Sequence, residues 1–116
     1  MSRAAQGLHA WLLQRLTAVY LAVYLLAMGG ILLARGVSGY ADWRDWFAQP
    51  WIGVSTAIFA IAAALHVWVG MRDVLIDYVH AVWLRLLLLA AFGLVLTGSL
   101  LWVARALTLA ALQGTV

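Results

Sequence analysis

Hydrophobic and polar positions along this chain alternate in long blocks rather than in short periods. Three uncharged runs are bounded by charged side chains, in the pairs Arg15 and Arg35, Asp45 and Arg72, and Arg85 and Arg105. The strongly apolar part of each run has about 20 residues, and at 1.5 Å each such a helix crosses a hydrocarbon core of roughly 30 Å. We therefore predict an all-α integral membrane protein with three transmembrane helices, over about residues 12–34, 51–71 and 83–104.

Composition supports a membrane location. Of the 116 residues, 67% are hydrophobic and only 9% are charged, whereas soluble domains carry about 25% charged residues. A soluble domain this small could not bury so many apolar side chains. The absence of cysteine excludes a disulfide scaffold, a thiolate metal site and a cysteine nucleophile. The few arginines form no stripe, so we expect no nucleic-acid partner. We expect one domain, residues 1–116.

Aromatic residues and loops fit these boundaries. All seven tryptophans fall within about two turns of a predicted helix end, where indole rings favour the membrane interface. We expect the first connection, residues 35–50, to be an irregular loop with a short amphipathic stretch, residues 42–47, on the surface. We expect the second connection, residues 72–82, to be a short loop that carries Asp73, Asp77, Tyr78 and His80.

The distribution of arginines predicts the orientation. Four arginines lie on the side of the N-terminus and the second loop, against three on the other side, so the positive-inside rule favours a cytoplasmic N-terminus. The first apolar run is too long for a cleaved signal peptide, and no small-x-small cleavage site follows it. We therefore expect this run to remain as a span.

His66 is the one histidine inside a predicted span. Its neighbours on the same helix face include the small residues Ala62, Ala63 and Gly70, which would leave room for a flat macrocycle whose iron the imidazole binds. The alternative is that His66 hydrogen-bonds a neighbouring helix and that the small residues serve close packing. His9 and His80 lie at span ends, so a haem with two histidine ligands would need its second ligand from another chain.

Two further features have a structural and a functional interpretation. Tyr78 is either an interfacial aromatic residue or, next to Asp77, an oriented hydroxyl that donates to a quinone carbonyl. Arg15 lies a turn inside the first predicted helix, at the level of Arg72. Its guanidinium either extends toward lipid phosphates or pairs with a buried carboxylate such as a haem propionate.

These residues resemble a known family, the paired membrane anchors of succinate dehydrogenase (respiratory complex II), which are of a C type and a D type. The string His66-Val67-Trp68-Val69-Gly70-Met71, the later Asp77-Tyr78-Val79 and the spacing of His9 and Arg15 are similar to the D-type anchor. The resemblance extends over nearly the whole chain. Arg72, close after Gly70, is also similar to the pattern of the C-type anchor, but Asp77-Tyr78 and the short N-terminus favour the D type.

The resemblance implies half of a heterodimeric membrane-anchor helix bundle in the bacterial inner membrane. His66 would be an axial ligand of haem b, with the second histidine from the companion anchor of the C type. Arg15 and His9 would lie near the propionates. Tyr78, supported by Asp77, would bind the quinone, which we expect to be ubiquinone. The chain has no dinucleotide-binding glycine pattern and no cysteine, so a flavoprotein and an iron–sulfur subunit would oxidise succinate.

Two other functions stay open at this stage. The chain could be a haem-free anchor or scaffold of a fumarate reductase or another membrane complex, with His66 as a packing residue. It could also be a small transporter subunit, although the first and third spans carry no charge inside the membrane. We interpret Thr17, Thr97 and Ser99 as helix-packing residues rather than as the lining of a pore.

Overall fold

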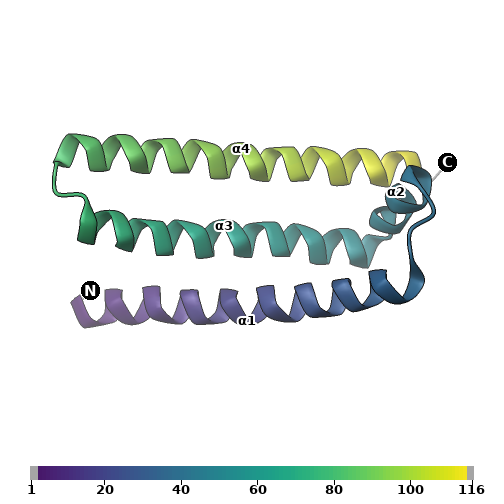
Figure 1. The fold of residues 1–116 in the computed structure, drawn as a ribbon, viewed down its shortest axis with the longest axis horizontal. Helices are drawn as coiled ribbons and strands as arrows, with labels where there is room; N and C mark the ends of the chain where they lie inside the picture. Colours follow the sequence, from purple (N-terminus) through teal and green to yellow (C-terminus); the bar gives the residue numbers. More distant parts are fainter. Residues whose placement is uncertain (1–2, 115–116) are drawn as a thin grey trace.

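The structure, a computed structural model, describes residues 3–114, with side chains from residue 6 onward. Its four helices are α1 (Arg3–Arg35), α2 (Tyr40–Ala48), α3 (Pro50–Tyr78) and α4 (Val82–Gly114). The three long helices are apolar enough to cross a membrane. Helix α3 runs roughly antiparallel to α1 and to α4 (Figure 1). Helix α2 packs at the end of the molecule where α4 finishes. The prediction of an all-α protein with three membrane-spanning helices is confirmed.

Glycine and proline define the connection around α2. Gly36 ends α1 in the left-handed region, with φ of 69°, and its N–H donates to the carbonyl of Leu32 at 2.9 Å. This arrangement satisfies a terminal carbonyl that the helix itself cannot pair, and glycine adopts it without a Cβ clash. Pro50 begins α3 in the first turn, where its missing N–H costs nothing.

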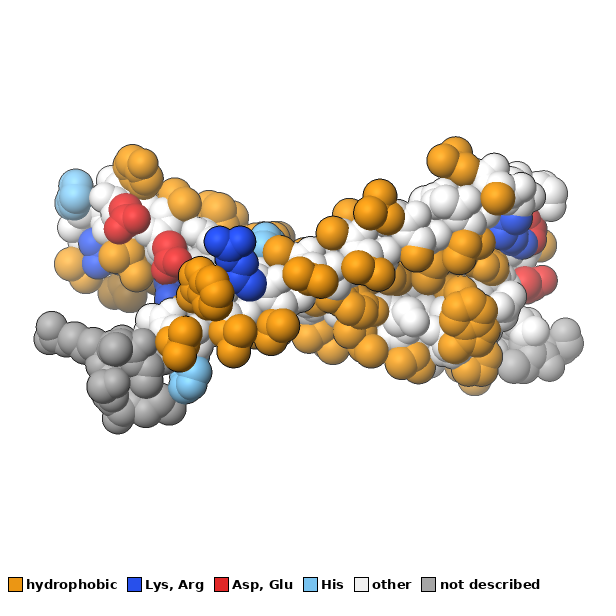
Figure 2. All heavy atoms as spheres, turned by 90° about the horizontal axis from the view of Figure 1, so that it is seen from below, with side chains coloured by type: hydrophobic (Ala, Val, Ile, Leu, Met, Phe, Trp, Pro, Cys, Tyr) orange, Lys and Arg blue, Asp and Glu red, His pale blue; other side chains and the backbone are white. Residues whose placement is uncertain are grey.

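Helix α3 lies between the other two long helices. Helix α3 packs against both α1 and α4, whereas within residues 3–114 α1 and α4 do not pack against each other (Figure 1). Few side chains are therefore buried, and the described face in Figure 2 is mostly hydrophobic between its two ends. With so few side chains buried, most of the apolar surface is left to lipid or to other helices.

Hydroxyl groups join α1 to α3. The hydroxyl of Tyr20 donates to the carbonyl of Ser55 at 2.7 Å, and the hydroxyls of Tyr24 and Thr56 lie 2.7 Å apart. The ring of Tyr24 also stacks on Phe59, with centroids 4.3 Å apart. Because lipid is as apolar as the side chains, helix association in a bilayer depends on such packing and hydrogen bonds. We call these contacts the polar seam.

The expected surface stretch is a regular helix, α2, and it is partly buried. Trp46 is 5% exposed and lies beneath the guanidinium of Arg35, 5.5 Å from its ring centroid. Asp42 accepts the backbone N–H of Ser38 and pairs with Arg35 at 2.7 Å, and these two contacts lower the pKa of its carboxyl. The prediction of a short amphipathic segment was right, and within it one residue, Trp46, is buried.

The helices also extend beyond the predicted spans. Helix α3 continues to Tyr78, so Asp73, Asp77 and Tyr78 lie on a helix and not in the expected loop, which is reduced to residues 79–81. Arg85 at the start of α4 donates from Nε and a terminal nitrogen to the carbonyl of Val79, at 3.1 and 2.9 Å. This contact pairs a backbone carbonyl just beyond the end of α3.

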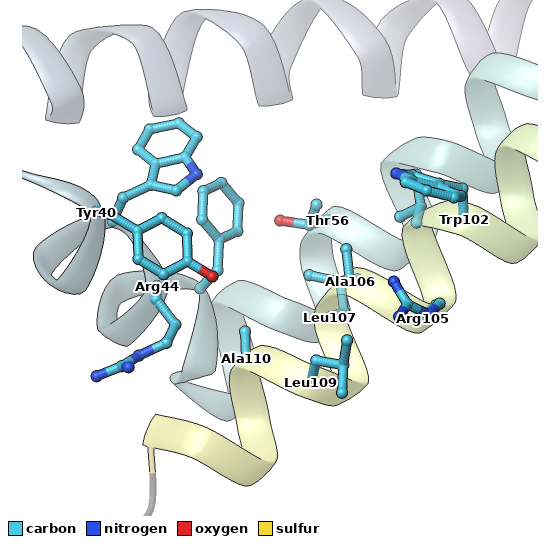
Figure 3. Close-up of a pocket in the computed structure, with 12 residues that line it drawn as sticks. Tyr40, Arg44, Thr56, Trp102, Arg105, Ala106, Leu107, Leu109 and Ala110 are labelled. Carbon is cyan, nitrogen blue, oxygen red and sulfur yellow. The ribbon is translucent and has the colours of Figure 1, made fainter.

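Helix α4 runs past the predicted span by a further segment, residues 105–114, which α2 covers. An open groove of about 410 Å³ lies between α2 and this part of α4. Figure 3 shows Tyr40 and Arg44 on its α2 side and Trp102 and Arg105 on its α4 side. Because the groove lies at the end of the molecule away from the α3–α4 turn, it is remote from His66.

Candidate functional site

His66 lies on the face of α3 that meets α1, and its side chain is partly buried. Its Nδ1 is 3.1 Å from the hydroxyl oxygen of Thr17 on α1. Thr17 is 7% exposed and is the one buried polar residue among those described. The hydrogen bond fixes one ring nitrogen against α1 and leaves Nε2 as the nitrogen available for another partner.

A groove of about 570 Å³ opens between α1 and α3 close to this contact. Arg15 and Gln14 line it from α1, and Arg72 and Asp73 line it from α3. Arg72 pairs with its neighbour Asp73 at 3.2 Å. Arg15 lies over the ring of Trp11 at 5.4 Å, and no carboxylate among the described side chains pairs with it. The groove therefore has an excess positive charge, which favours an anionic partner.

Gln14, which lines this groove, has a side-chain oxygen without a hydrogen bond in the described part of the chain. Its Oε1 is buried and has no hydrogen-bond partner among the described residues. A Cβ placed on Gly70 would lie 3.4 Å from Gln14 Nε2, so the glycine allows α1 to approach α3 closely. Ala62 on the same face of α3 is also buried. Of the three small residues beside His66, Ala62 is thus buried within the chain and Gly70 lies next to the Gln14 side chain.

The other two histidines lie at different levels. His9 lies in the second turn of α1, near the start of that helix. His9 is exposed and is eight residues from Thr17, which corresponds to about 12 Å along the helix axis. His80 follows the end of α3, which lies about 18 Å along the axis from His66. Neither is placed to share an iron with His66.

Asp77 and Tyr78 occupy the last turn of α3 and are both exposed, Tyr78 by 79%. Within the described residues neither side chain makes a hydrogen bond, and the two do not contact one another through their polar atoms. The backbone beneath them is held in place by Arg85. The phenol is therefore presented outward, free to meet a partner that this chain does not provide.

The contact of Thr17 with His66 was not predicted, because we interpreted Thr17 as a packing residue. Forty-nine positions separate the two residues, and no spacing rule relates residues on different helices. A weak signal was present, since Thr17 follows Arg15 by two positions and lies in an otherwise apolar stretch. Gln14 was overlooked for the same reason.

Comparison with known proteins identifies the family of the chain. Residues 1–110 match the family described as "Succinate dehydrogenase/Fumarate reductase transmembrane subunit". A succinate dehydrogenase hydrophobic membrane anchor subunit from Coxiella burnetii (strain RSA 493 / Nine Mile phase I) is 29% identical over 97 residues, which cover 84% of each chain. This multi-pass membrane protein therefore belongs to the transmembrane subunit family of succinate dehydrogenases and fumarate reductases.

Proposed function

We propose that this chain anchors a succinate:quinone oxidoreductase in the membrane and that His66 is an axial ligand of a haem b held between this chain and a companion anchor. The observation that carries the proposal is the hydrogen bond at His66 Nδ1, which occupies one ring nitrogen and leaves Nε2 for a metal. Histidines that bind metals commonly use their other nitrogen in such a bond.

The donor set near His66 suits haem b. Arg15 lacks a carboxylate partner within the described part of the chain, and a propionate would pair with its planar guanidinium through two hydrogen bonds. Arg72 shares the same groove, and the excess positive charge there would offset the two propionates. When bound, the haem would supply one-electron redox chemistry. His9 stays a weaker candidate for the propionate region, since it does not line the groove.

The second axial ligand then comes from another chain. His9 and His80 are too far from His66 along the helix axes to reach the same iron. The Thr17 and Gln14 side chains of α1 lie against His66 and Gly70, which also favours a pocket completed from outside. We propose that the companion anchor, of the C type, provides that histidine.

We propose a second role for Tyr78. Its exposed hydroxyl donates to a carbonyl of ubiquinone, and Asp77 provides a polar neighbour. Reduction adds negative charge to the quinone oxygen, so a donor placed there stabilises the reduced form and the transition state leading to it. Arg85 contributes indirectly, because it fixes the backbone at the end of α3.

The proposed assembly has four kinds of subunit. Helix α4 has no buried residue among those described, so it has wide apolar surface for lipid and for the companion anchor. An iron–sulfur subunit and a flavoprotein would dock where Tyr78 and the N-terminus lie, which we place on the cytoplasmic side of a bacterial inner membrane. These two subunits oxidise succinate and pass electrons to the quinone.

The test is the purified complex with His66→Ala. We expect its haem absorption bands to disappear while the four subunits still co-purify, because the change removes a ligand and shortens one side chain. His80→Ala is the matched control, since this exposed histidine lies outside the helices, and it should keep the bands. Unchanged bands in His66→Ala would overturn the ligand assignment and favour a haem-free anchor.

A further inference from the structure

The hydroxyl of Thr17 lies within hydrogen-bonding distance of three other polar atoms but has only one proton to donate. Its oxygen lies 2.8 Å from the carbonyl oxygen of Leu13, 3.1 Å from that of Gln14 and 3.1 Å from Nδ1 of His66. Both carbonyls can only accept a hydrogen bond. A hydroxyl has one proton and two lone pairs, so the largest number of these contacts is satisfied when Thr17 donates to one carbonyl and accepts from Nδ1.

The single hydroxyl proton of Thr17 goes to its own helix, toward Leu13 or Gln14. The oxygen then offers only lone pairs to His66, and Nδ1 must be the donor. A neutral imidazole with a proton on Nδ1 has its free lone pair on Nε2. A charged imidazolium would make the same contact, but no carboxylate among the described residues pairs with His66 to offset a charge inside the membrane.

We propose that Thr17 is the positioning residue for His66: its hydroxyl oxygen accepts the Nδ1 proton and so selects the tautomer and the ring orientation that direct the Nε2 lone pair to the haem iron. This inference rests on the proposed function of His66 as a ligand. Donation from Nδ1 also increases the electron density of the imidazole, which favours the ferric iron. The contact therefore adjusts the redox potential as well as the geometry.

The buried position of Thr17 explains how the contact stays in place. The residue is 7% exposed, and its hydroxyl is fixed to the preceding turn of α1 by the Leu13 contact. Gly70, one turn beyond His66, lets the Gln14 side chain of α1 approach. The imidazole thus lies against a preorganised acceptor in a region with little water, where a hydrogen bond is stronger than at a surface.

The experiment uses the whole complex with three variants of this chain. Thr17→Val removes the hydroxyl and keeps the shape, and Thr17→Ser restores a hydroxyl. Thr56→Val is the matched control, because it deletes another interhelical hydroxyl of the same α1–α3 contact ten residues, or about 15 Å, from His66. The readouts are the electron paramagnetic resonance spectrum of the ferric haem, its midpoint potential and its retention during purification.

We expect Thr17→Val to change the ferric spectrum, to move the midpoint potential to more positive values and to weaken haem retention by about tenfold or more. Thr17→Ser and Thr56→Val should match the wild type. The proposal is overturned if Thr17→Val also matches the wild type, if Thr56→Val shifts the spectrum equally, or if Thr17→Ser does not restore it.

Should Thr17→Val fail to assemble, Thr17→Ala decides, because its smaller side chain fits without displacing a neighbour. Failure of Thr17→Ala to assemble would also overturn the proposal, since it would show that Thr17 acts in packing. The His66→Ala complex distinguishes a failure of the proposed haem ligand from a failure of the role proposed for Thr17. Haem kept in His66→Ala refutes the proposed ligand itself, whereas haem lost there together with an unchanged Thr17→Val refutes only the role of Thr17.

Discussion

If the polar seam joins α1 to α3, the hydroxyl pair of Tyr24 and Thr56 should have a measurable coupling energy. Thr56 donates its only proton to the carbonyl of Ile52 at 2.8 Å, so Tyr24 must be the donor in the 2.7 Å contact between the two hydroxyls. Tyr24→Phe removes this donor and leaves Thr56 with an unused lone pair, not with a buried unpaired proton. That is the milder form of an unsatisfied group.

The expected magnitude is small. Interhelical hydrogen bonds in membranes are worth about 0.6 kcal/mol on average and up to about 1.7 kcal/mol. We expect a coupling near the lower value in a double-mutant cycle of Tyr24→Phe and Thr56→Val, because Thr56 keeps its bond to Ile52 when Tyr24 changes. Tyr24→Leu should cost about 0.5–1.5 kcal/mol more, since it also removes the stacking on Phe59 at 4.3 Å.

The assay measures separation of α1 from α3 in mixed micelles with increasing SDS. The chain has no cysteine, so cysteines introduced at the exposed positions Leu8 and His80 can carry a pair of energy-transfer labels. Both positions lie at the end of the molecule where α1 begins and the α3–α4 turn lies (Figure 1). A coupling energy of zero, or Tyr24→Phe as costly as Tyr24→Leu, would refute the argument for a polar seam.

Three further predictions concern Arg15, Tyr78 and Asp42. Arg15→Lys keeps the charge but loses the bidentate geometry, so haem retention should fall about tenfold, which corresponds to about 1.4 kcal/mol. The control is Arg105, which like Arg15 lies over a tryptophan ring, and Arg105→Lys should leave haem retention unchanged. Tyr78→Phe should lower quinone turnover about a hundredfold at unchanged haem content; equal turnover would make Tyr78 an interfacial aromatic residue. The folded pKa of Asp42 is lowered, so its stabilising effect is complete above the ordinary value of 3.8 and disappears as the pH falls through the folded pKa. Acidification, or Asp42→Asn at neutral pH, should therefore lower the hydrogen-exchange protection over residues 36–48, measured against the exchange rate of the unfolded chain at the same pH, more than Asp45→Asn does.

Most of the fold could be predicted because the bilayer imposes a simple rule on sequence. A span needs about 20 apolar residues, and charged residues such as Arg35 and Arg85 mark where these runs end. That rule concerns hydrophobic thickness and not helix length. Tyr78 and residues 105–114 were placed outside the spans, but their helices continue past the predicted boundaries because the backbone hydrogen bonds persist there.

The candidate site was only partly predictable. The burial cost of an ionisable side chain in a span singled out His66, and Arg15 was identified by its depth in the first apolar run. The partner of His66 was not identifiable, because Thr17 has an ordinary place in a helix and its role depends on how α1 and α3 align. Whether Ala62 and Gly70 admit a ligand or a neighbouring helix depends on the same alignment. Composition supports both interpretations equally, and only the packing of α1 distinguishes them.

The hydroxyls that bond back to their own helices have a consequence for biogenesis. Five side chains donate to the carbonyl one turn earlier: Thr17, Ser55, Thr56, Ser99 and Thr108. During synthesis α1 reaches the membrane before α3, and each of these hydroxyls already has a partner at that moment. For these five side chains each helix can therefore enter lipid without an unpaired hydroxyl proton, whereas the phenols of Tyr20 and Tyr24 find their acceptors only when α1 meets α3. Pairing of α1 with α3, and later with the companion anchor, can wait until the whole chain has been inserted.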